Sequence, residues 1–450
     1  MDKKGNQVLT TEHLNRTLGK KELYAIAFGH IVGAGIFALI GIGIGMTGKS
    51  LFIGILLSSV FILAQAWPLM IISGTARFRG GMYSIMSKLW NSKLAGFYII
   101  IFSVSNISLA MYAISFAEYL QGVFTNAPIR PVALICLTVF FIVNILGVEG
   151  AAKLQIVMDI VLALALTLFI IYGMPQVDMN TLFTEDFMTA GPLGLLTCAV
   201  LLTWATAGGI DMINLSAEAI NPKRDIPQVI IVVTLAVSVF YALIALVSAG
   251  VLPVELTADQ PLTVVAAHIF PKPLYLFFVL AGALLALTTT LNASFTWVTK
   301  PILQACNDGW FPKKMGYLHP KFKTPVIILS IFYVIGLIPI IFGLDIETIA
   351  FSAVILSNIL FVLICFGAIN IPKKLPEFWE KSKFKCSKGV LTIAAIIGAL
   401  ASATTCVLLL MDAALIHVIC ICVVTVIGVI YAFVRYKTGK VDIQESVEEA

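Results

Sequence analysis

Apolar stretches of about 20 residues recur along the whole of this chain, and each is long enough to cross the roughly 30 Å hydrocarbon core of a bilayer. About twelve such spans are predicted. They lie at residues 22–46, 50–76, 94–124, 131–146, 154–174, 191–219, 227–251, 273–303, 324–342, 346–370, 389–410 and 413–434. Unpaired backbone groups are very costly in lipid, so each span is predicted to be a helix. The predicted fold class is an all-α membrane protein.

Composition and charge support this reading and exclude a soluble enzyme. Of the 450 residues, 60% are hydrophobic and 12% are charged, whereas about 25% are charged in a soluble globular protein. With both termini cytoplasmic, every Lys and Arg except Lys49, Arg130 and Lys272 falls on the cytoplasmic side, as the positive-inside rule requires. The sequence therefore predicts a multi-pass protein of the cell (plasma) membrane. The net charge of +5 is a topology signal and indicates no nucleic-acid partner.

Motifs for other activities are missing from the sequence. The polar first 20 residues lead directly into a span, so no cleavable signal peptide is expected. The eight cysteines include no CxxC pair, and they imply neither a metal site nor a disulfide framework. There is no nucleophile elbow, phosphate loop or pair of catalytic carboxylates. The sequence predicts no enzyme and no resident cofactor.

Two predicted spans contain clusters of glycine at comparable depth. The first span has Gly29, Gly33 and Gly35, and the sixth has Gly208 and Gly209. Glycine costs about 1 kcal/mol relative to alanine inside a helix. One cluster alone could simply allow close helix packing. Interruptions at matching positions of two five-span halves instead indicate the midplane binding site of a transporter.

The predicted organisation follows from this match. Residues 1–19 form an N-terminal cytoplasmic segment, 20–175 a first five-helix repeat, and 190–370 a second repeat. The second repeat is inverted because an odd number of helices brings the chain in from the opposite side. Residues 388–435 hold helices eleven and twelve, and 436–450 a cytoplasmic tail. The polar stretch at 255–270 is predicted to be a short surface or re-entrant helix that could serve as an outer lid.

Four motifs, in order along residues 18–435, resemble those of the amino acid–polyamine–organocation superfamily of permeases. They are residues 31–37 (IVGAGIF), 80–83 (GGMY), 218–227 (EAINPKRDIP) and 307–312 (NDGWFP). Ala34 stands where many members of the superfamily have serine. The resemblance implies the five-plus-five inverted-repeat fold of the sodium-coupled leucine transporter, with helices one and six broken. It also implies secondary active transport by symport or antiport.

The resemblance implies a substrate site at the two broken helices. Half-helix N-termini offer free N–H groups and positive dipole to a carboxylate, and the ends of the preceding half-helices offer carbonyls to an ammonium group. By this match, amides of Gly33, Ala34 and Gly35 and carbonyls of Ile31, Trp204 and Ala207 bind substrate, with Gly208, Gly209 and Asn106 in the pocket. The alternative for Asn106 is a hydrogen bond to a neighbouring helix.

The candidates for ion coupling lie on spans one, five, six and eight. Oxygen ligands suit a hard cation, and the resemblance implies a Na⁺ site at Gly29, Val32, Thr289 and Thr290, with Thr288 beside it. The alternative for the threonines is back-bonding to their own helix. The lysine that replaces sodium in many relatives is missing, since Leu162 stands near its place. Asp159, Asp211 and His30 are candidates for H⁺ coupling; a structural role is the alternative for His30.

The function predicted is secondary active transport of a small neutral amino acid by alternating access, with sodium favoured as the coupling ion. Ile210 occupies the position of a gating glutamate in the arginine/agmatine antiporter, which argues against acid-driven arginine exchange. The rival is proton-coupled or exchange transport of a cationic amino acid or polyamine, using Asp211. A channel or membrane-embedded enzyme is the alternative from another class. The predicted partners are an amino acid or related amine and the lipid bilayer; no oligomeric state is predicted.

Overall fold

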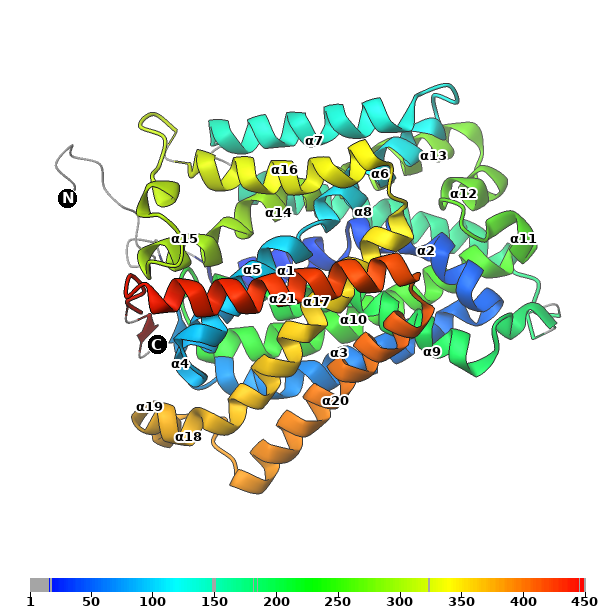
Figure 1. Ribbon diagram of the computed structural model, residues 1–450. Helices are drawn as coiled ribbons and strands as arrows, with labels where there is room; N and C mark the ends of the chain where they lie inside the picture. Colours follow the sequence, from blue (N-terminus) through cyan, green and yellow to red (C-terminus); the bar gives the residue numbers. More distant parts are fainter. Residues whose placement is uncertain are drawn as a thin grey trace.

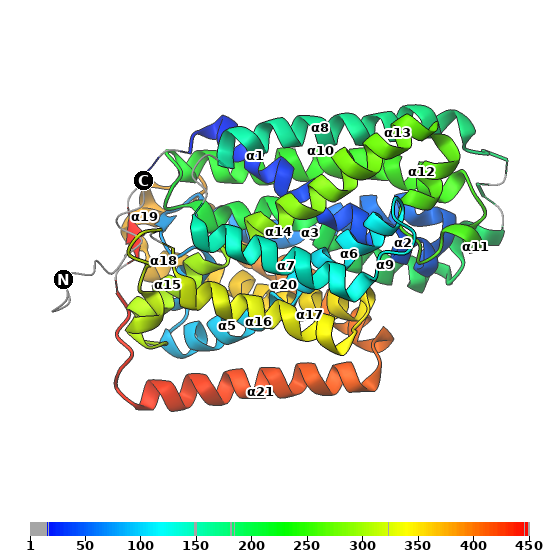
Figure 2. The same cartoon turned by 90° about the horizontal axis from the view of Figure 1, so that it is seen from above.

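The helices run lengthwise in one elongated bundle in a computed structural model of the chain (Figures 1 and 2). The structure describes residues 16, 18–147, 151–180, 182–183, 185–322, 324–444 and 446–448, with the backbone alone at 151–157, 185 and 296. The predicted N-terminal segment at 1–19 therefore lies largely outside the described residues.

The first part of the bundle is built from residues up to Gln176. Its elements are α1 (Lys20–Ile31), α2 (Ala34–Thr47), η2 (Gly48–Ser50), α3 (Leu51–Ser73), β1 (Arg77–Phe78), α4 (Met82–Leu89), α5 (Ser92–Ser105), α6 (Ser108–Gln121), α7 (Ile129–Leu146), α8 (Ala151–Gly173) and η3 (Met174–Gln176).

The second part begins after a connection that contains η4 (Glu185–Met188). Its elements are α9 (Gly191–Thr206), η5 (Ala207–Leu215), α10 (Pro222–Gly250), α11 (Val254–Thr257), α12 (Thr263–Ile269), α13 (Lys272–Phe277), η6 (Phe278–Leu284), α14 (Leu285–Trp297), α15 (Thr299–Asn307), η7 (Lys313–Gly316), α16 (Val326–Phe342), α17 (Ile346–Gly367), η8 (Ala368–Asn370), α18 (Ile371–Lys374), α19 (Pro376–Lys381), α20 (Lys388–Asp412), α21 (Leu415–Lys437) and β2 (Val447–Glu448).

The predicted all-α membrane fold class is confirmed. Ten helical stretches of the described chain are long and apolar enough to cross a membrane. One of them, Lys20–Ser73, contains the first two predicted spans, and Val326–Phe342 is a shorter apolar helix at the ninth. The layout of twelve crossings in two inverted repeats stays a prediction.

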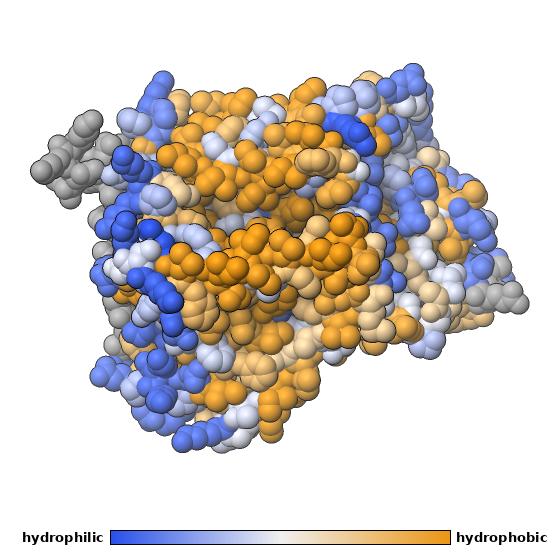
Figure 3. All heavy atoms as spheres, in the orientation of Figure 1, coloured by the Kyte–Doolittle hydropathy of each residue, from blue (hydrophilic) through white to orange (hydrophobic). Residues whose placement is uncertain are grey.

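The outer surface of the bundle is that of a protein immersed in lipid. Hydrophobic residues form a broad band over the visible face, and hydrophilic residues gather towards its two ends (Figure 3). Large apolar side chains such as Ile135 on α7, Phe342 on α16 and Leu415 on α21 are more than half exposed. In water this surface would be unfavourable, whereas in hydrocarbon it needs no cover.

Several spans are interrupted. The first breaks at Val32 and Gly33, between α1 and α2, and the sixth changes from α9 to the 3-10 helix η5 at Ala207. Both interruptions lie at the predicted glycine clusters. Two further ones were not predicted: α5 ends before Asn106, and η6 is a π-helical turn in the eighth span. The Asn106 side chain donates to the Phe102 carbonyl (2.7 Å), a local bond that competes with the helix ladder.

The two ends of the bundle carry different connections. At one end, which we call the terminal end, α1 begins and α21 finishes (Figure 1). There Leu18 pairs with Ala219, and β1 pairs antiparallel with β2. The opposite end, which we call the lid end, carries α11 and α12 in the segment predicted to form a lid. Asp259 N–H donates to the Gly41 carbonyl (2.9 Å), so this segment rests on α2.

Close packing near the terminal end depends on a glycine in α5. Trp310 is completely buried and its ring lies against Gly96, where an added Cβ atom would overlap the ring. We expect Gly96→Val to lower the midpoint of thermal unfolding in detergent, because overpacking of this kind costs about 1–3 kcal/mol.

The control is Gly389→Ala in α20, where the nearest atom to an added Cβ is Ser387 Oγ at 3.8 Å. Tryptophan fluorescence during heating measures both midpoints. Equal midpoints for Gly96→Val and the unmodified protein would contradict the packing described.

Candidate functional site

A cavity of about 100 Å³ lies between two groups of helices. One group, which we call wall A, consists of α3, α9 and η5, which pack together. The other, wall B, consists of α5, α6, α14 and α17. The lining residues are Ile62, Gln65, Met82, Tyr98, Phe102, Ser105, Asn106, Tyr112, Thr203, Trp204, Ala207, Asp211, Asn214, Trp297, Val354, Ser357, Asn358, Leu360, Phe361 and Ile364. Aromatic rings and a few amides therefore surround a single carboxylate.

The structure brings four of the sequence-predicted residues to this cavity. Asn106 at the end of α5, Trp204 in α9, and Ala207 and Asp211 in η5 line it together. The residues of the first-span break, and the glycine pair of η5, are not among the lining residues. The predicted substrate-binding residues that do not line the cavity are Ile31, Gly33, Ala34, Gly35, Gly208 and Gly209.

The polar groups at the break between α1 and α2 have partners within the protein. The Val32 and Gly33 amides donate to the carbonyls of Phe28 (2.6 Å) and Ile31 (2.8 Å). Ala34 N–H donates to Thr290 Oγ1 (3.1 Å), and the Tyr241 hydroxyl donates to the Ile31 carbonyl. The Ala34 amide and the Ile31 carbonyl, both expected to bind substrate, are therefore engaged in this structure.

The glycines beside the two breaks let neighbouring elements approach closely. An added Cβ at Gly35 would lie 2.7 Å from Ala205 Cα, and one at Gly208 would lie 2.7 Å from His30 Cδ2. At Gly209 it would meet Ile230 of α10 at 3.3 Å, and at Gly33 it would overlap the Thr290 hydroxyl. Close packing through small residues, the alternative reading of these clusters, thus accounts for all four contacts.

Asp211 and His30 form a pair that the sequence analysis treated as two separate candidates. His30 Nε2 lies 3.2 Å from Asp211 Oδ2, and the two side chains are 13% and 29% exposed. The Trp297 ring meets the His30 ring edge-on, with centroids 6.0 Å apart. In the 3-10 helix η5, Asp211 lines the cavity, whereas the preceding residue Ile210 is fully buried and is not a lining residue.

The threonines of the eighth span divide into two kinds. The hydroxyls of Thr288 and Thr289 donate to carbonyls of Leu285 and Ala286, each at 2.9 Å. These two side chains therefore show the back-bonding alternative. Thr290 instead faces the broken first span, where its Oγ1 and the Gly29 carbonyl both lie against Gly33.

The other ion-coupling candidates do not line the cavity. Asp159 is buried in α8, as is Leu162, which stands near the place of the missing lysine. Val32 is buried at the break. Neither Asp159 nor Val32 is a lining residue.

Several lining residues escaped the sequence analysis. Tyr98, Phe102 and Trp297 are aromatic residues in apolar spans, where the sequence gives them no distinction from lipid-facing or core residues. Gln65 and Asn358 did carry a signal, because amides inside apolar spans are rare. The Gln65 side chain donates to Asn358 Oδ1 (2.8 Å) and so bridges α3 and α17.

The bundle has an apolar exterior, and interrupted helices lie beside a partly polar cavity within it. This combination is typical of a membrane transporter. The chain matches the amino acid permease family over residues 18–434, and it belongs to that family, a branch of the superfamily that its motifs resemble. The protein is thus a multi-pass membrane permease and not an enzyme.

Three similar proteins illustrate the range of the family. The branched-chain amino acid permease BcaP of Bacillus subtilis is 25% identical over 83% of this chain and 84% of its own length. The methylthioribose transporter of the same organism is 25% identical over 70% and 72%. The large neutral amino acids transporter small subunit 2 of Rattus norvegicus is 26% identical over 70% and 62%.

Trp297 offers a direct test of the cavity as a binding site. We expect Trp297→Ala to raise the KM for uptake about 10- to 100-fold, because losing contact with a large aromatic face costs about 1.5–3 kcal/mol. Radiolabelled amino acid uptake into proteoliposomes measures KM. The control is Phe342→Ala, which removes an aromatic ring that is 76% exposed on the bundle exterior. An unchanged KM in Trp297→Ala would argue for a site elsewhere.

Proposed function

We propose that this chain moves a small neutral amino acid across the cell membrane by secondary active, alternating-access transport, with both termini in the cytoplasm. The observation that carries the proposal is the cavity between walls A and B, which joins Asp211, Trp204 and Asn106 beside the interruption of the sixth span. Its volume of about 100 Å³ is small compared with the roughly 300–1,000 Å³ of pockets for drug-sized ligands. A small substrate suits this space.

The charges around the cavity support a neutral substrate. Asp211 is the carboxylate among the lining residues, and it already lies beside His30. A zwitterion brings its own balancing charges, so its ammonium group can approach Asp211 and the carbonyls of Trp204 and Ala207. Its carboxylate then needs donors, which amides at the broken helices, from Gly33 to Gly35, supply when their present partners rearrange.

Alternating access requires contacts at each end that can break in turn. At the lid end, the Tyr119 hydroxyl donates to the Phe37 carbonyl (3.0 Å) and accepts from Leu262 N–H (2.9 Å). At the terminal end, Met82 N–H donates to Asn214 Oδ1 (3.1 Å). We propose that the two hydrogen bonds at the lid end and the one at the terminal end close the substrate path on its two sides.

Competition experiments test the substrate class. We expect small neutral amino acids to inhibit uptake into proteoliposomes, and lysine, arginine and putrescine to have little effect, because the Asp211 carboxylate already has a hydrogen-bond partner in His30. Inhibition by the cationic compounds alone would support the rival substrate class. Flux that does not saturate with substrate concentration would instead indicate a channel.

For the coupling ion we propose sodium, with H⁺ as the second candidate. The Thr290 hydroxyl and the Gly29 carbonyl converge on Gly33, and with the Val32 carbonyl they offer the oxygen ligands that Na⁺ prefers. The Thr289 hydroxyl donates its hydrogen to the Ala286 carbonyl, but its oxygen keeps lone pairs that can bind a cation. The observation that favours H⁺ is the His30–Asp211 pair at the cavity, since ionisable side chains inside a membrane commonly belong to proton pathways.

Ion replacement separates these two candidates. We expect uptake to be faster in sodium than in choline medium at fixed pH, and we expect Thr289→Ala with Thr290→Ala to weaken sodium activation about 10- to 100-fold. Thr288→Ala is the matched control, because Thr288 lies outside the proposed ligand set.

Sodium-independent uptake in the unmodified protein would contradict the sodium proposal. Stimulation by an inward pH gradient that is lost in Asp211→Asn would then support coupling to H⁺.

A further inference from the structure

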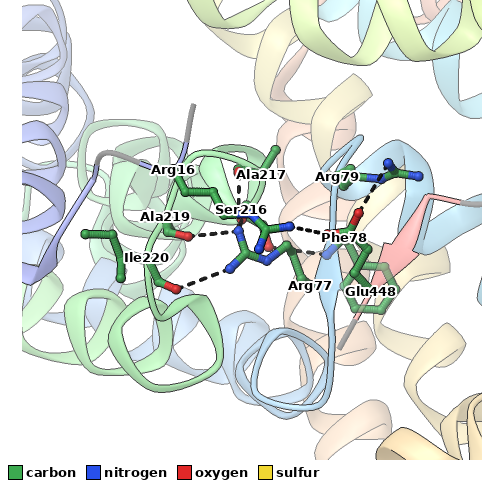
Figure 4. Close-up of polar contacts among 9 residues, drawn as sticks. All are labelled: Arg16, Arg77, Phe78, Arg79, Ser216, Ala217, Ala219, Ile220 and Glu448. Carbon is green, nitrogen blue, oxygen red and sulfur yellow. Dashed lines mark hydrogen bonds and ion pairs between the residues drawn. The ribbon is translucent and has the colours of Figure 1, made fainter. Parts of the chain in front are cut away.

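The described residues of the C-terminal tail, 440–444 and 446–448, form a docked segment, which we call the strap. Its strand β2 pairs with β1, so that Glu448 lies opposite Arg77 and Val447 opposite Phe78. Arg79 N–H donates to the Ser446 carbonyl (2.9 Å). The Glu448 carboxylate lies between two guanidinium groups, at 2.9 Å from Arg16 and 3.3 Å from Arg79 (Figure 4).

The strap has a second anchor at the turn that follows α15. The backbone N–H of Asp442 donates to the Asp308 carbonyl (3.0 Å), and the backbone N–H of Gln444 donates to Asp308 Oδ1 (3.2 Å). The Lys440 carbonyl lies against Gly309, whose φ of +83° and lack of a Cβ atom allow this close approach. The Asp308 carboxylate also accepts from the Tyr83 hydroxyl (2.7 Å). The strap is therefore tied to two separate parts of the protein.

Arg77 extends the first anchor to a third segment. Its side chain is buried, and its guanidinium donates to the carbonyls of Ala219 (2.9 Å) and Ile220 (3.2 Å), just after η5 (Figure 4). Burial lowers the pKa of this guanidinium, but arginine remains charged at neutral pH. These charge-assisted hydrogen bonds fix β1 to the end of wall A.

The two anchors differ in how they contact the walls of the cavity. β1 follows α3 and is held by Arg77 to the end of η5, and α3 and η5 are both in wall A. β1 also leads into α4, which packs against α5 and α17 of wall B. Asp308 follows α15, which continues α14 of wall B. Helix α21, from which the strap extends, packs against α5 of wall B. A movement that separates the walls at the terminal end must therefore either break the contacts of β1 with the end of η5 or release β1 from the strap.

We propose that the strap is an autoinhibitory latch: while it is docked it opposes opening of the cavity at the terminal end, and its release speeds transport. The inference rests on the proposed function, because it needs the walls to separate during the transport cycle.

The contacts of the strap suit a latch that can be released. Backbone hydrogen bonds contribute modestly in net terms, and the Arg16 and Glu448 side chains are 56% and 29% exposed, where ion pairs are weak. A latch of this strength slows the opening of the cavity at the terminal end without preventing it.

Removal of the strap is the first test. We expect deletion of residues 441–450 to raise the maximal uptake rate about three- to tenfold, which corresponds to the loss of a few hydrogen bonds. Glu448→Ala should give a smaller rise. Glu377→Ala is the matched control, because Glu377 is an exposed carboxylate on α19 that takes part in none of the strap contacts described above. An unchanged or lower rate, at equal protein in the membrane and equal thermal midpoint, would overturn the proposal.

A covalent lock tests the same idea if the deletion impairs folding. Phe78 and Val447 are cross-strand partners, and Cα atoms of such pairs lie about 4.5–5.5 Å apart, within the range for a disulfide. We expect oxidised Phe78→Cys with Val447→Cys to lose uptake at least about tenfold, and dithiothreitol to restore it. The single variants Phe78→Cys and Val447→Cys, oxidised in the same way, control for the native cysteines.

Full uptake with the disulfide formed would overturn the latch, whatever the deletion does. If the unmodified protein takes up no amino acid at all, the proposed function fails instead. The two failures are therefore distinguishable.

Discussion

Every backbone N–H and C=O group inside a bilayer needs a partner, because water is not there to supply one. Most of this chain meets that demand with unbroken helix. Where a helix stops, other elements must reach in, as the Thr290 and Tyr241 side chains do for Ala34 and Ile31. The interruptions are thus costly sites that are held by long-range contacts, and the cavity lies beside them.

The sequence predicts those features of the fold that depend on local composition. Apolar length gives the helical spans, and glycine clusters mark the two interruptions at Gly33 and Gly208. The break at Asn106 and the π-helical turn at Phe278–Leu284 have weaker local signals. In that turn Gly282 faces Ala165 of α8, where an added Cβ would be 3.0 Å away, a contact with a different helix that the local sequence does not reveal.

The cavity is less predictable than the fold, because its residues are brought together by packing. Asn106, Trp204, Ala207 and Asp211 were identified through motifs and polarity, but nothing in the sequence pairs Asp211 with His30, 181 positions away. Conversely, Gly35 and Gly209 suggest a ligand site by composition, whereas their contacts are with Ala205 and Ile230. A glycine cluster marks where chains approach closely, and only the structure tells which partner approaches.

The pairing of β1 with β2 also bears on how the protein is made. β1 leaves the ribosome early, directly after α3, whereas β2 follows α21. Helix α21 must therefore be synthesised before β1 and β2 can pair at the terminal end. A chain released early by a stop codon near residue 440 would have all its apolar helices and could insert normally, yet its loop after α3 would lack its partner strand.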